Sequence, residues 1–329
     1  MIHWTVFLRR CIPSALGMFG LILLPGLQQP LRAQAATAAK QKVIIDTDIG
    51  DDIDDAFALA LALESPELDI LQVNSDFGNT PLRARLLERF LHAVHREDIP
   101  VAVGGQTKAP NDLTQRRYAE EFPANDLPNR DAVQSTLDLI RKYPGEITLI
   151  GIGPYVNIGA MIDKDPETFR KLKRVVIMGG SVYVGYFNGT DADYLHPPAA
   201  QPEWNVMRDI PGAQRLFASG VPIYMMPLDA TQLKLDEVKR QLLFRHDSPI
   251  TDQLVLLYYQ WGQLTPTLFD PMAVGYAINP ELCPVTPIHI RVDDQGYTRQ
   301  EPGEPNANVC LHSDSEKFFE FYMPRLLQH

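Results

Sequence analysis

Cysteine and positive charge are both scarce in this sequence. Only three of its 329 residues are cysteine, which is too few for a small fold held together by disulfide bonds. Its 30 lysines and arginines are outnumbered by 41 aspartates and glutamates, so the formal net charge is -11. A chain this acidic is not expected to bind nucleic acid or an anionic membrane surface as its main partner.

Internal repeats, low-complexity tracts and Gly/Ser-rich linkers are absent from the sequence after residue 41. Hydrophobic residues make up 45% of the chain, which is ordinary for a globular protein and excludes the collagen-like and disordered classes. The length allows one large α/β domain or two smaller ones. Because no linker divides the chain, we expect a single domain.

The first 35 residues have the three-part organisation of a secretory signal peptide. The pair Arg9-Arg10 precedes an uncharged, leucine-rich run over residues 11–27, and Ala33-Gln34-Ala35 follows as a small-residue cleavage pattern. The alternative is an uncleaved membrane anchor, although the run is shorter than the roughly 20 residues that a span needs. We therefore expect a signal peptide at residues 1–35, a mature domain at residues 36–329 without a stable membrane anchor, and export to the periplasm or the extracellular space.

Cleavage after Ala35 removes Cys11 and leaves Cys283 and Cys310 in the mature chain. In an oxidising compartment, two such thiols are compatible with a disulfide bond. They are equally compatible with two separate buried cysteines, and the sequence does not decide between these two states.

Short β-branched segments alternate with amphipathic segments along the rest of the chain. Strands are expected at residues 43–45, 68–73, 101–103, 147–150, 175–178 and 221–226. The helix after the second strand has Thr80 as its expected cap and Pro81 at its first position. This βαβ rhythm predicts an α/β domain with a central, mostly parallel sheet flanked by helices. The C-terminal part predicts a hairpin over residues 288–299 and a closing helix over residues 318–327.

Six carboxylates occur within ten residues directly after the first expected strand, in the segment Asp46-Thr47-Asp48-Ile49-Gly50-Asp51-Asp52-Ile53-Asp54-Asp55. Ligands of parallel sheets bind at the carboxyl ends of the strands. The dipole of a following helix stabilises aspartates in its first turn by about 0.3–1 kcal/mol each, which accounts for one or two of the six. Acids packed together raise one another's pKa, and a divalent cation relieves that repulsion. Because an all-oxygen ligand set favours Ca²⁺ or Mg²⁺ over Zn²⁺, the segment predicts a metal site.

Residues 46–50, followed by Asp54-Asp55-Ala56, resemble the amino-terminal signature of the calcium-dependent nucleoside hydrolases, the inosine–uridine-preferring group and its relatives. Further segments resemble other motifs of this family in the same order, namely Gly78-Asn79, residues 151–158, Met178-Gly179-Gly180, Glu203-Trp204-Asn205, and residues 227–231 and 269–274. The resemblance covers roughly residues 42–325. It implies a nucleoside-hydrolase-like fold with a Rossmann-type core, a Ca²⁺ cofactor, and hydrolysis of the N-glycosidic bond of ribonucleosides to ribose and free base. Family members are often dimers or tetramers, so a homo-oligomer is a further implication.

The resemblance also implies roles for individual residues. Asp48 would be both a metal ligand and the general base for the attacking water. The other metal ligands would be Asp55, Asp270 and the main-chain carbonyl of Ile152. The side chains that would hold the ribose hydroxyls are Asp54, Asn79, Glu203 and Asn205.

These residue types suit the cleavage of an N-glycosidic bond. The sugar becomes oxocarbenium-like in the transition state, so carboxylates near C1′ stabilise the developing positive charge. A water held on Ca²⁺ is more acidic than free water, and a carboxylate can take its proton. A metal that holds the vicinal diol orients the sugar and selects ribose over 2′-deoxyribose.

Two of these positions have simpler readings, and the assignment of the paired aspartates has an alternative. Asn79 is also typical of a turn residue, and Asp270 before a proline is typical of a helix N-cap. The commonest signature of the family has two fewer residues before the paired aspartates, so Asp52 is an alternative to Asp54 or Asp55.

Two positions depart from the pattern of the family. Phe269 stands where many members have the histidine that protonates the leaving base, and Tyr186 stands where asparagine is common. The usual acid is therefore missing from this chain. His196 is a candidate replacement if the proline-rich segment around it closes over the site.

Two functions of other classes also fit parts of the sequence. A phosphatase of the haloacid dehalogenase type begins with a strand and Asp-x-Asp, as Asp46-Thr47-Asp48 does, but the surplus acids at residues 51–55 are then unexplained. An exported, non-catalytic protein that binds nucleosides or sugars would use the same pocket, and the missing acid favours this alternative.

Overall fold

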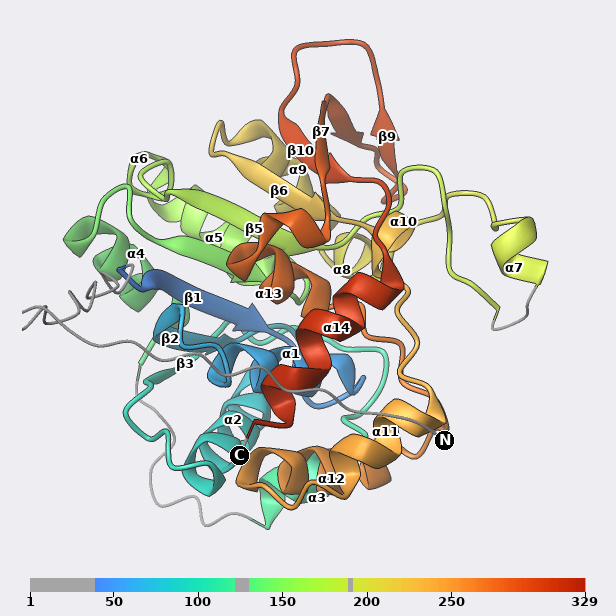
Figure 1. Cartoon of the computed structure of the whole chain (residues 1–329). Helices are drawn as coiled ribbons and strands as arrows, with labels where there is room; N and C mark the ends of the chain where they lie inside the picture. The colour runs from blue at the N-terminus through green and yellow to red at the C-terminus, as the bar shows by residue number, and fades with distance from the viewer. Residues whose placement is uncertain (1–38, 122–129, 189–191, 329) are drawn as a thin grey trace, which may run out of the picture. The chain divides into compact units, whose positions relative to one another are not determined.

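An eight-stranded sheet runs through the unit that begins at Ala39 in the computed structural model (Figure 1). The structure describes residues 39–121, 130–188 and 192–328, so the expected signal peptide lies outside the described residues. The strand order is β3-β2-β1-β4-β5-β6-β10-β7. The strands are β1 (Gln41–Thr47), β2 (Leu68–Ser75), β3 (Val101–Val103), β4 (Thr148–Gly151), β5 (Arg174–Met178), β6 (Ile223–Met226), β7 (Val285–Ile288) and β10 (Ala307–Cys310).

All pairings in this sheet are parallel except that of β10 with β7, which is antiparallel and forms one edge. The longer helices are α1 (Asp54–Leu63), α2 (Thr80–Ala93), α4 (Ala132–Lys142), α5 (Val156–Lys164), α9 (Ile210–Ala218), α11 (Glu237–Phe244), α12 (Pro249–Trp261), α13 (Pro271–Ile278) and α14 (Ser315–Leu326). The short helices are α3 (Arg116–Glu120), α6 (Pro166–Phe169), α7 (Ala192–Leu195), α8 (Trp204–Arg208), α10 (Leu228–Thr231) and the 3₁₀ turn η1 (Pro280–Leu282). The predicted α/β domain with a mostly parallel central sheet is therefore confirmed.

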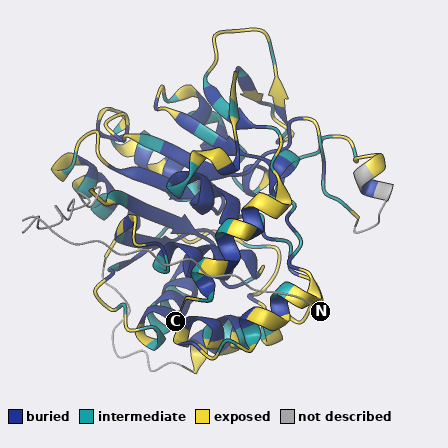
Figure 2. Cartoon of the chain, viewed as in Figure 1, coloured by how far each residue is buried: buried dark blue, intermediate teal, exposed yellow. Residues whose placement is uncertain are grey.

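The side chains of β1 alternate between two hydrophobic cores. Val43 and Ile45 are fully buried in the core to which α1, α2, α12, α13 and α14 contribute. Ile44 points to the other face, into the core formed with α4, α5 and α9. This alternation follows from the pleat of a strand, and Figure 2 shows the strands as the buried layer between helices with exposed outer faces. Both faces of β1 are covered, which fixes the end of this strand firmly in the middle of the sheet.

Three details of the fold differ from the sequence-based expectations. The cap of α2 is Asn79, whose side chain accepts a hydrogen bond from the Leu82 amide, and Thr80 is already helical. The strand expected to begin at residue 288 is not continuous. Residue 288 is the last residue of β7, which belongs to the main sheet. The hairpin consists of β8 (Ile290–Val292) and β9 (Thr298–Gln300), which pair in antiparallel fashion. The sequence patterns indicate neither β10 nor helices α11 and α12, and they indicate α13 only through the reading of Asp270 as an N-cap before a proline.

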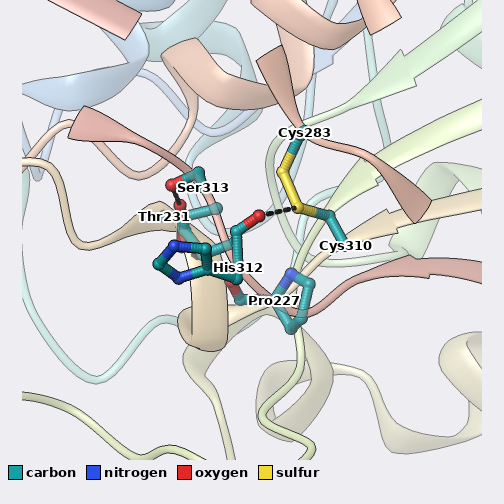
Figure 3. The surroundings of a disulfide bond; sticks show 7 residues. Pro227, Thr231, Cys283, Cys310, His312 and Ser313 are labelled. Carbon is teal, nitrogen blue, oxygen red and sulfur yellow. Dashed lines mark hydrogen bonds between the residues drawn. A yellow bond between two sulfur atoms is a disulfide. The ribbon is translucent and has the colours of Figure 1, made fainter. Parts of the chain in front are cut away.

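Cys283 and Cys310 form a disulfide bond with a Cα–Cα distance of 5.6 Å (Figure 3). Cys283 follows η1, just beyond α13, and Cys310 ends β10. The bond therefore ties the end of α13 to the sheet across 27 residues of sequence. Among the residues that the structure describes, no helix is both long enough and apolar enough to cross a bilayer.

We predict that replacing both cysteines, in Cys283→Ala/Cys310→Ala, lowers the free energy of unfolding by about 3 kcal/mol, because the unfolded chain regains the freedom of the closed loop. Chemical denaturation measures this loss. Alkylation without reductant, followed by peptide mapping, gives the control: neither thiol should be labelled in the parent protein. Two labelled thiols would contradict the bond.

Candidate functional site

A cavity of about 350 Å³ opens beside the carboxyl ends of β1, β4 and β5. The residues that line it are Asp48, Asp51, Asp52, Asp54, Asp55, Asn111, Thr114, Ile152, Met178, Tyr186, Glu203, Trp204, Asn205, Trp261, Gln263, Phe269 and Asp270. This is the edge of a parallel sheet at which ligands bind. Seven of the eight residues predicted for the site line the cavity, and Asn79 does not.

Asp54, Asp55 and Asp270 form the tightest group of acids in the cavity. Each contributes one carboxylate oxygen, and the three oxygens lie within 4.8 Å of one another. Their exposed fractions are only 5%, 4% and 3%. Asp54 and Asp55 occupy the first turn of α1, and Asp270 directly precedes α13, which packs against α1. The packing of two helices therefore brings together acids that lie more than two hundred residues apart.

The buried acids of this group hold their protons strongly when no cation is bound. Burial, together with repulsion from neighbouring carboxylates, raises the pKa of Asp54, Asp55 and Asp270 well above the usual range. Asp55 accepts a hydrogen bond from the Thr47 hydroxyl, and one oxygen of Asp54 accepts the Asp270 amide. A buried, all-oxygen set of this kind fits a hard divalent cation, whose charge would offset the repulsion.

The two alternative readings of these acids can be compared with the structure. Asp270 precedes α13, but its side chain makes no capping hydrogen bond, so capping does not account for its burial. Asp52 lines the cavity but is exposed and lies outside the group of three.

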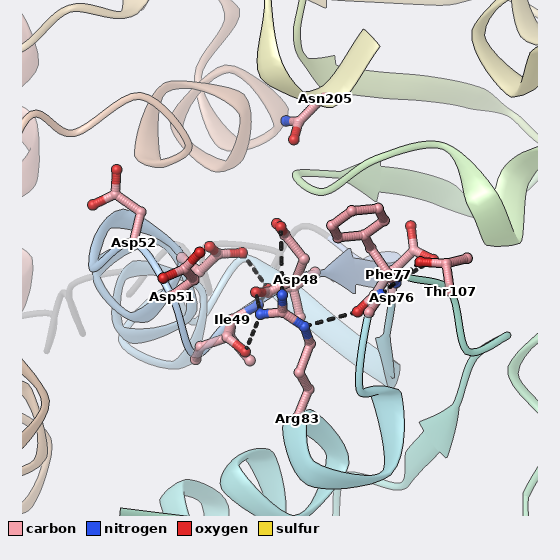
Figure 4. A network of polar contacts seen from close by, with 12 residues as sticks. Asp48, Ile49, Asp51, Asp52, Asp76, Phe77, Arg83, Thr107 and Asn205 are labelled. Carbon is pink, nitrogen blue, oxygen red and sulfur yellow. Dashed lines mark hydrogen bonds and ion pairs between the residues drawn. The ribbon is translucent and has the colours of Figure 1, made fainter. Parts of the chain in front are cut away.

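Asp48 lies one residue beyond β1 and faces the cavity (Figure 4). Burial raises its pKa to about 6, and the nearby Arg83 guanidinium opposes that rise. Gly153 passes so close that a Cβ there would lie 2.9 Å from the Asp48 main-chain nitrogen. Only glycine, which has no Cβ, can lie so close to the Asp48 main chain. This explains why glycine follows Ile152. A carboxylate with this pKa is suited to accept a proton near neutral pH.

Arg83 was not singled out in the sequence, yet it holds the loop that carries Asp48. Its side chain is 2% exposed and donates hydrogen bonds to the main-chain carbonyls of Asp48, Ile49 and Phe77. One guanidinium nitrogen also lies 4.0 Å from an Asp48 carboxylate oxygen. The loops after β1 and β2 are therefore joined by one buried cation (Figure 4). One feature of the sequence could have identified Arg83 as buried. It lies one helical turn before Leu86 and Leu87, on the buried face of α2.

Glu203 and Asn205 stand at the start of α8 and line the cavity. Glu203 accepts hydrogen bonds from the amides of Gly180 at 2.8 Å, Asn205 at 2.9 Å and Val206 at 3.2 Å. Burial raises its pKa to about 7. The Asn205 amide donates to the carbonyls of Met178 and Ile152 at 3.1 and 3.4 Å. These bonds fix both side chains at the edge of the cavity and bring Asn205 to the carbonyl predicted as a metal ligand.

The structure does not bring Asn79 to the cavity. Asn79 is exposed, and its side chain is used by the first turn of α2. His196, the candidate acid, is also exposed and is not part of the lining. The lining of the cavity is also partly aromatic. Tyr186 and Phe269 meet there edge to face, with 6.0 Å between ring centroids.

Comparison with known proteins gives consistent matches along the chain. Residues 43–320 match the family model described as inosine-uridine preferring nucleoside hydrolase. The pyrimidine-specific ribonucleoside hydrolase RihA of Escherichia fergusonii is 30% identical over 316 residues, which cover 86% of this chain and 97% of that protein. RihA of an Enterobacter species is 31% identical, with 87% and 97% covered.

Two solved structures are similar in fold. The plant nucleoside hydrolase PpNRh1 has a TM-score of 0.75 at 26% identity, with 88% of this chain and 99% of that chain covered. The purine-preferring ribonucleoside hydrolase from Gardnerella vaginalis has a TM-score of 0.73 at 23% identity, with 88% and 98% covered.

The raised pKa values, about 6 for Asp48, about 7 for Glu203 and well above the usual range for Asp54, Asp55 and Asp270, predict that the metal-free protein loses stability as the pH rises above about 4. The folded state binds these protons more tightly than the unfolded chain, so their contribution is complete below the unfolded pKa near 4 and is lost as the pH passes the folded values. Each proton that only the folded state retains makes the free energy of unfolding fall more steeply, by about 1.4 kcal/mol per pH unit.

Chemical denaturation in chelator, at several pH values, measures this slope. Asp55→Asn should flatten the slope, and Asp69→Asn, which changes an exposed acid of β2, should not. A metal-free protein that becomes more stable with rising pH over this range would contradict the account.

Proposed function

Because the chain belongs to the inosine-uridine preferring nucleoside hydrolase family, we propose how its buried acids split a ribonucleoside. The protein is an N-glycosyl hydrolase of ribonucleosides, and its substrate is a small molecule. The single observation that supports a metal-assisted reaction is the group of three buried carboxylate oxygens within 4.8 Å of one another. We propose Ca²⁺ as the ion, because all-oxygen donors fit a hard divalent cation and the motifs of the sequence resemble those of calcium-dependent nucleoside hydrolases.

Asp55 and Asp270 would hold the ion, together with Asp48 and the carbonyl of Ile152 from the neighbouring strand ends. One oxygen of Asp54 accepts the Asp270 amide at 3.3 Å, which leaves its other oxygen for a ribose hydroxyl. When bound, Ca²⁺ would supply a fixed positive charge that orients the vicinal diol and makes a nearby water more acidic. The donor set of the chain fits this use, since it places several acids on one side of a sugar-sized cavity.

The residues of the chain would then carry the reaction. Asp48 would take a proton from the attacking water. Glu203 and Asn205 hold the ribose from the opposite side of the cavity, in orientations fixed by their own hydrogen bonds. As the bond to the base lengthens, the surrounding carboxylates stabilise the positive charge that develops on the sugar.

We also propose that the protein is exported, as the N-terminal sequence suggests. The disulfide between Cys283 and Cys310 supports this proposal, because such bonds persist in oxidising compartments and are rare in reducing ones. The family match leaves the Asp-x-Asp phosphatase without support. A binding protein without turnover remains the second candidate, since Phe269 occupies the position expected for the acid.

A panel of ribonucleosides and 2′-deoxyribonucleosides, measured by the release of reducing sugar with and without chelator, tests the proposal. We expect turnover of ribonucleosides that is lost in chelator and restored by excess Ca²⁺, and little turnover of the deoxy substrates. Asp48→Asn should lower kcat by about 10²–10⁴-fold, because the base for the water is removed. Its far-UV circular dichroism and urea midpoint serve as the check that the fold is retained.

The matched control is Asp69→Asn, which removes an exposed carboxylate of β2 outside the cavity. It should retain the parent activity. Tight binding of ribonucleosides without any release of ribose would favour the binding protein. Substantial activity of Asp48→Asn would assign the base to another residue.

A further inference from the structure

Two acids of the cavity have no part in the mechanism above. Asp51 and Asp52 line the cavity but lie outside the group formed by Asp54, Asp55 and Asp270. Figure 4 shows both beside Asp48, on the loop that leads into α1. Asp51 is half-buried and Asp52 is exposed, so both carboxylates can contribute charge to the outer part of the cavity.

The charge of the lining has one sign. Seven of the lining residues are aspartate or glutamate, and among the described residues that line the cavity none is lysine, arginine or histidine. A bound divalent cation would neutralise only part of this negative charge. The potential in the cavity therefore favours a cationic ligand and opposes the formation of an anion there.

Two arginines approach the site from behind its walls. Arg83 lies beneath Asp48 and is used by three main-chain carbonyls. Arg208 stacks on Trp204, with its guanidinium carbon 3.8 Å from the ring centroid. Neither residue is part of the lining.

Four aromatic residues line the cavity. They are Tyr186, Trp204, Trp261 and Phe269. Aromatic faces attract cations through the negative potential above the ring. The lining also includes the neutral polar residues Asn111, Thr114 and Gln263.

The aromatic residues of the lining are poorly suited to help a neutral base leave. A neutral base must leave either as an anion, which the acidic lining opposes, or after receiving a proton. The hydroxyl of Tyr186 is directed to Glu203 at 3.5 Å and accepts the Trp204 amide at 3.0 Å. Burial raises the pKa of Tyr186 above its ordinary value, so this hydroxyl is a weak acid. Phe269 supplies no proton at all.

We propose that the preferred substrates are N-ribosides whose base carries a positive charge on the ring joined to the ribose, such as pyridinium ribosides and N7-methylated purine ribonucleosides. This inference rests on the proposed hydrolytic function. The C1′–N bond breaks, and its electron pair neutralises the cationic ring, so the base leaves without a proton. The oxygen of water forms the new bond to C1′, and Asp48 takes the proton that the water loses.

A direct test compares kcat/KM for nicotinamide riboside and 7-methylinosine with that for uridine and inosine, using the Ca²⁺-loaded protein. We expect the two cationic substrates to exceed the two neutral ones by at least tenfold. Because charged bases are also intrinsically better leaving groups, binding is measured separately. The cation 1-methylnicotinamide should inhibit competitively at concentrations at which its neutral isostere, 3-methylbenzamide, does not.

The variant Asp51→Asn/Asp52→Asn keeps the shape of both side chains and removes their charge. It should reduce the ratio of cationic to neutral kcat/KM severalfold. The matched control, Asp69→Asn/Glu320→Gln, removes two exposed acids that do not line the cavity, and it should leave the ratio unchanged.

The outcomes separate the inference from the function on which it rests. Uridine or inosine turned over as well as the cationic substrates, equal inhibition by the two isosteres, or an unchanged ratio in Asp51→Asn/Asp52→Asn would each overturn the preference while the hydrolase stands. If no riboside of either kind releases ribose, the proposed function fails and the inference fails with it.

Discussion

The repulsion among buried carboxylates is the constraint on which the site depends. Asp54, Asp55 and Asp270 bring three oxygens within 4.8 Å of one another in a place almost closed to water. Without a counterion, these groups keep their protons, and their pKa values rise accordingly. A divalent cation would let all three ionise. The same gathering of charge that makes the metal-free site unfavourable thus creates a strong place for a hard ion and for the sugar next to it.

The fold supplies this arrangement at the buried centre of its sheet. Strand β1 is covered on both faces, so Asp48 emerges from the centre of the sheet at a fixed point. The packing of α1 against α13 adds the paired aspartates and Asp270. Arg83 ties the loop of Asp48 to the loop after β2 through main-chain carbonyls. The disulfide after α13 anchors the far end of that helix.

The position of the acids after β1 could be predicted from the sequence. These acids follow a buried strand, and the carboxyl ends of parallel strands meet at one edge of the sheet. Glu203 and Asn205, which line the cavity, stand at the start of a helix and were expected at the site only from the family resemblance. Arg83 was missed because a charged residue in an amphipathic helix is normally assigned to the exposed face. The disulfide was left open because spacing in sequence does not determine distance in space.

Asn79 shows the limit of reasoning from a motif. Its carbonyl oxygen satisfies an amide of the first turn of α2, and this local use is indistinguishable in sequence from a role at the ligand. The most direct test of the central claim is anomalous diffraction from crystals of the protein grown in calcium. The account predicts one ion at about 2.3–2.6 Å from oxygens of Asp55 and Asp270. An empty cluster in a well-refined map, with its carboxylates turned to solvent, would contradict it.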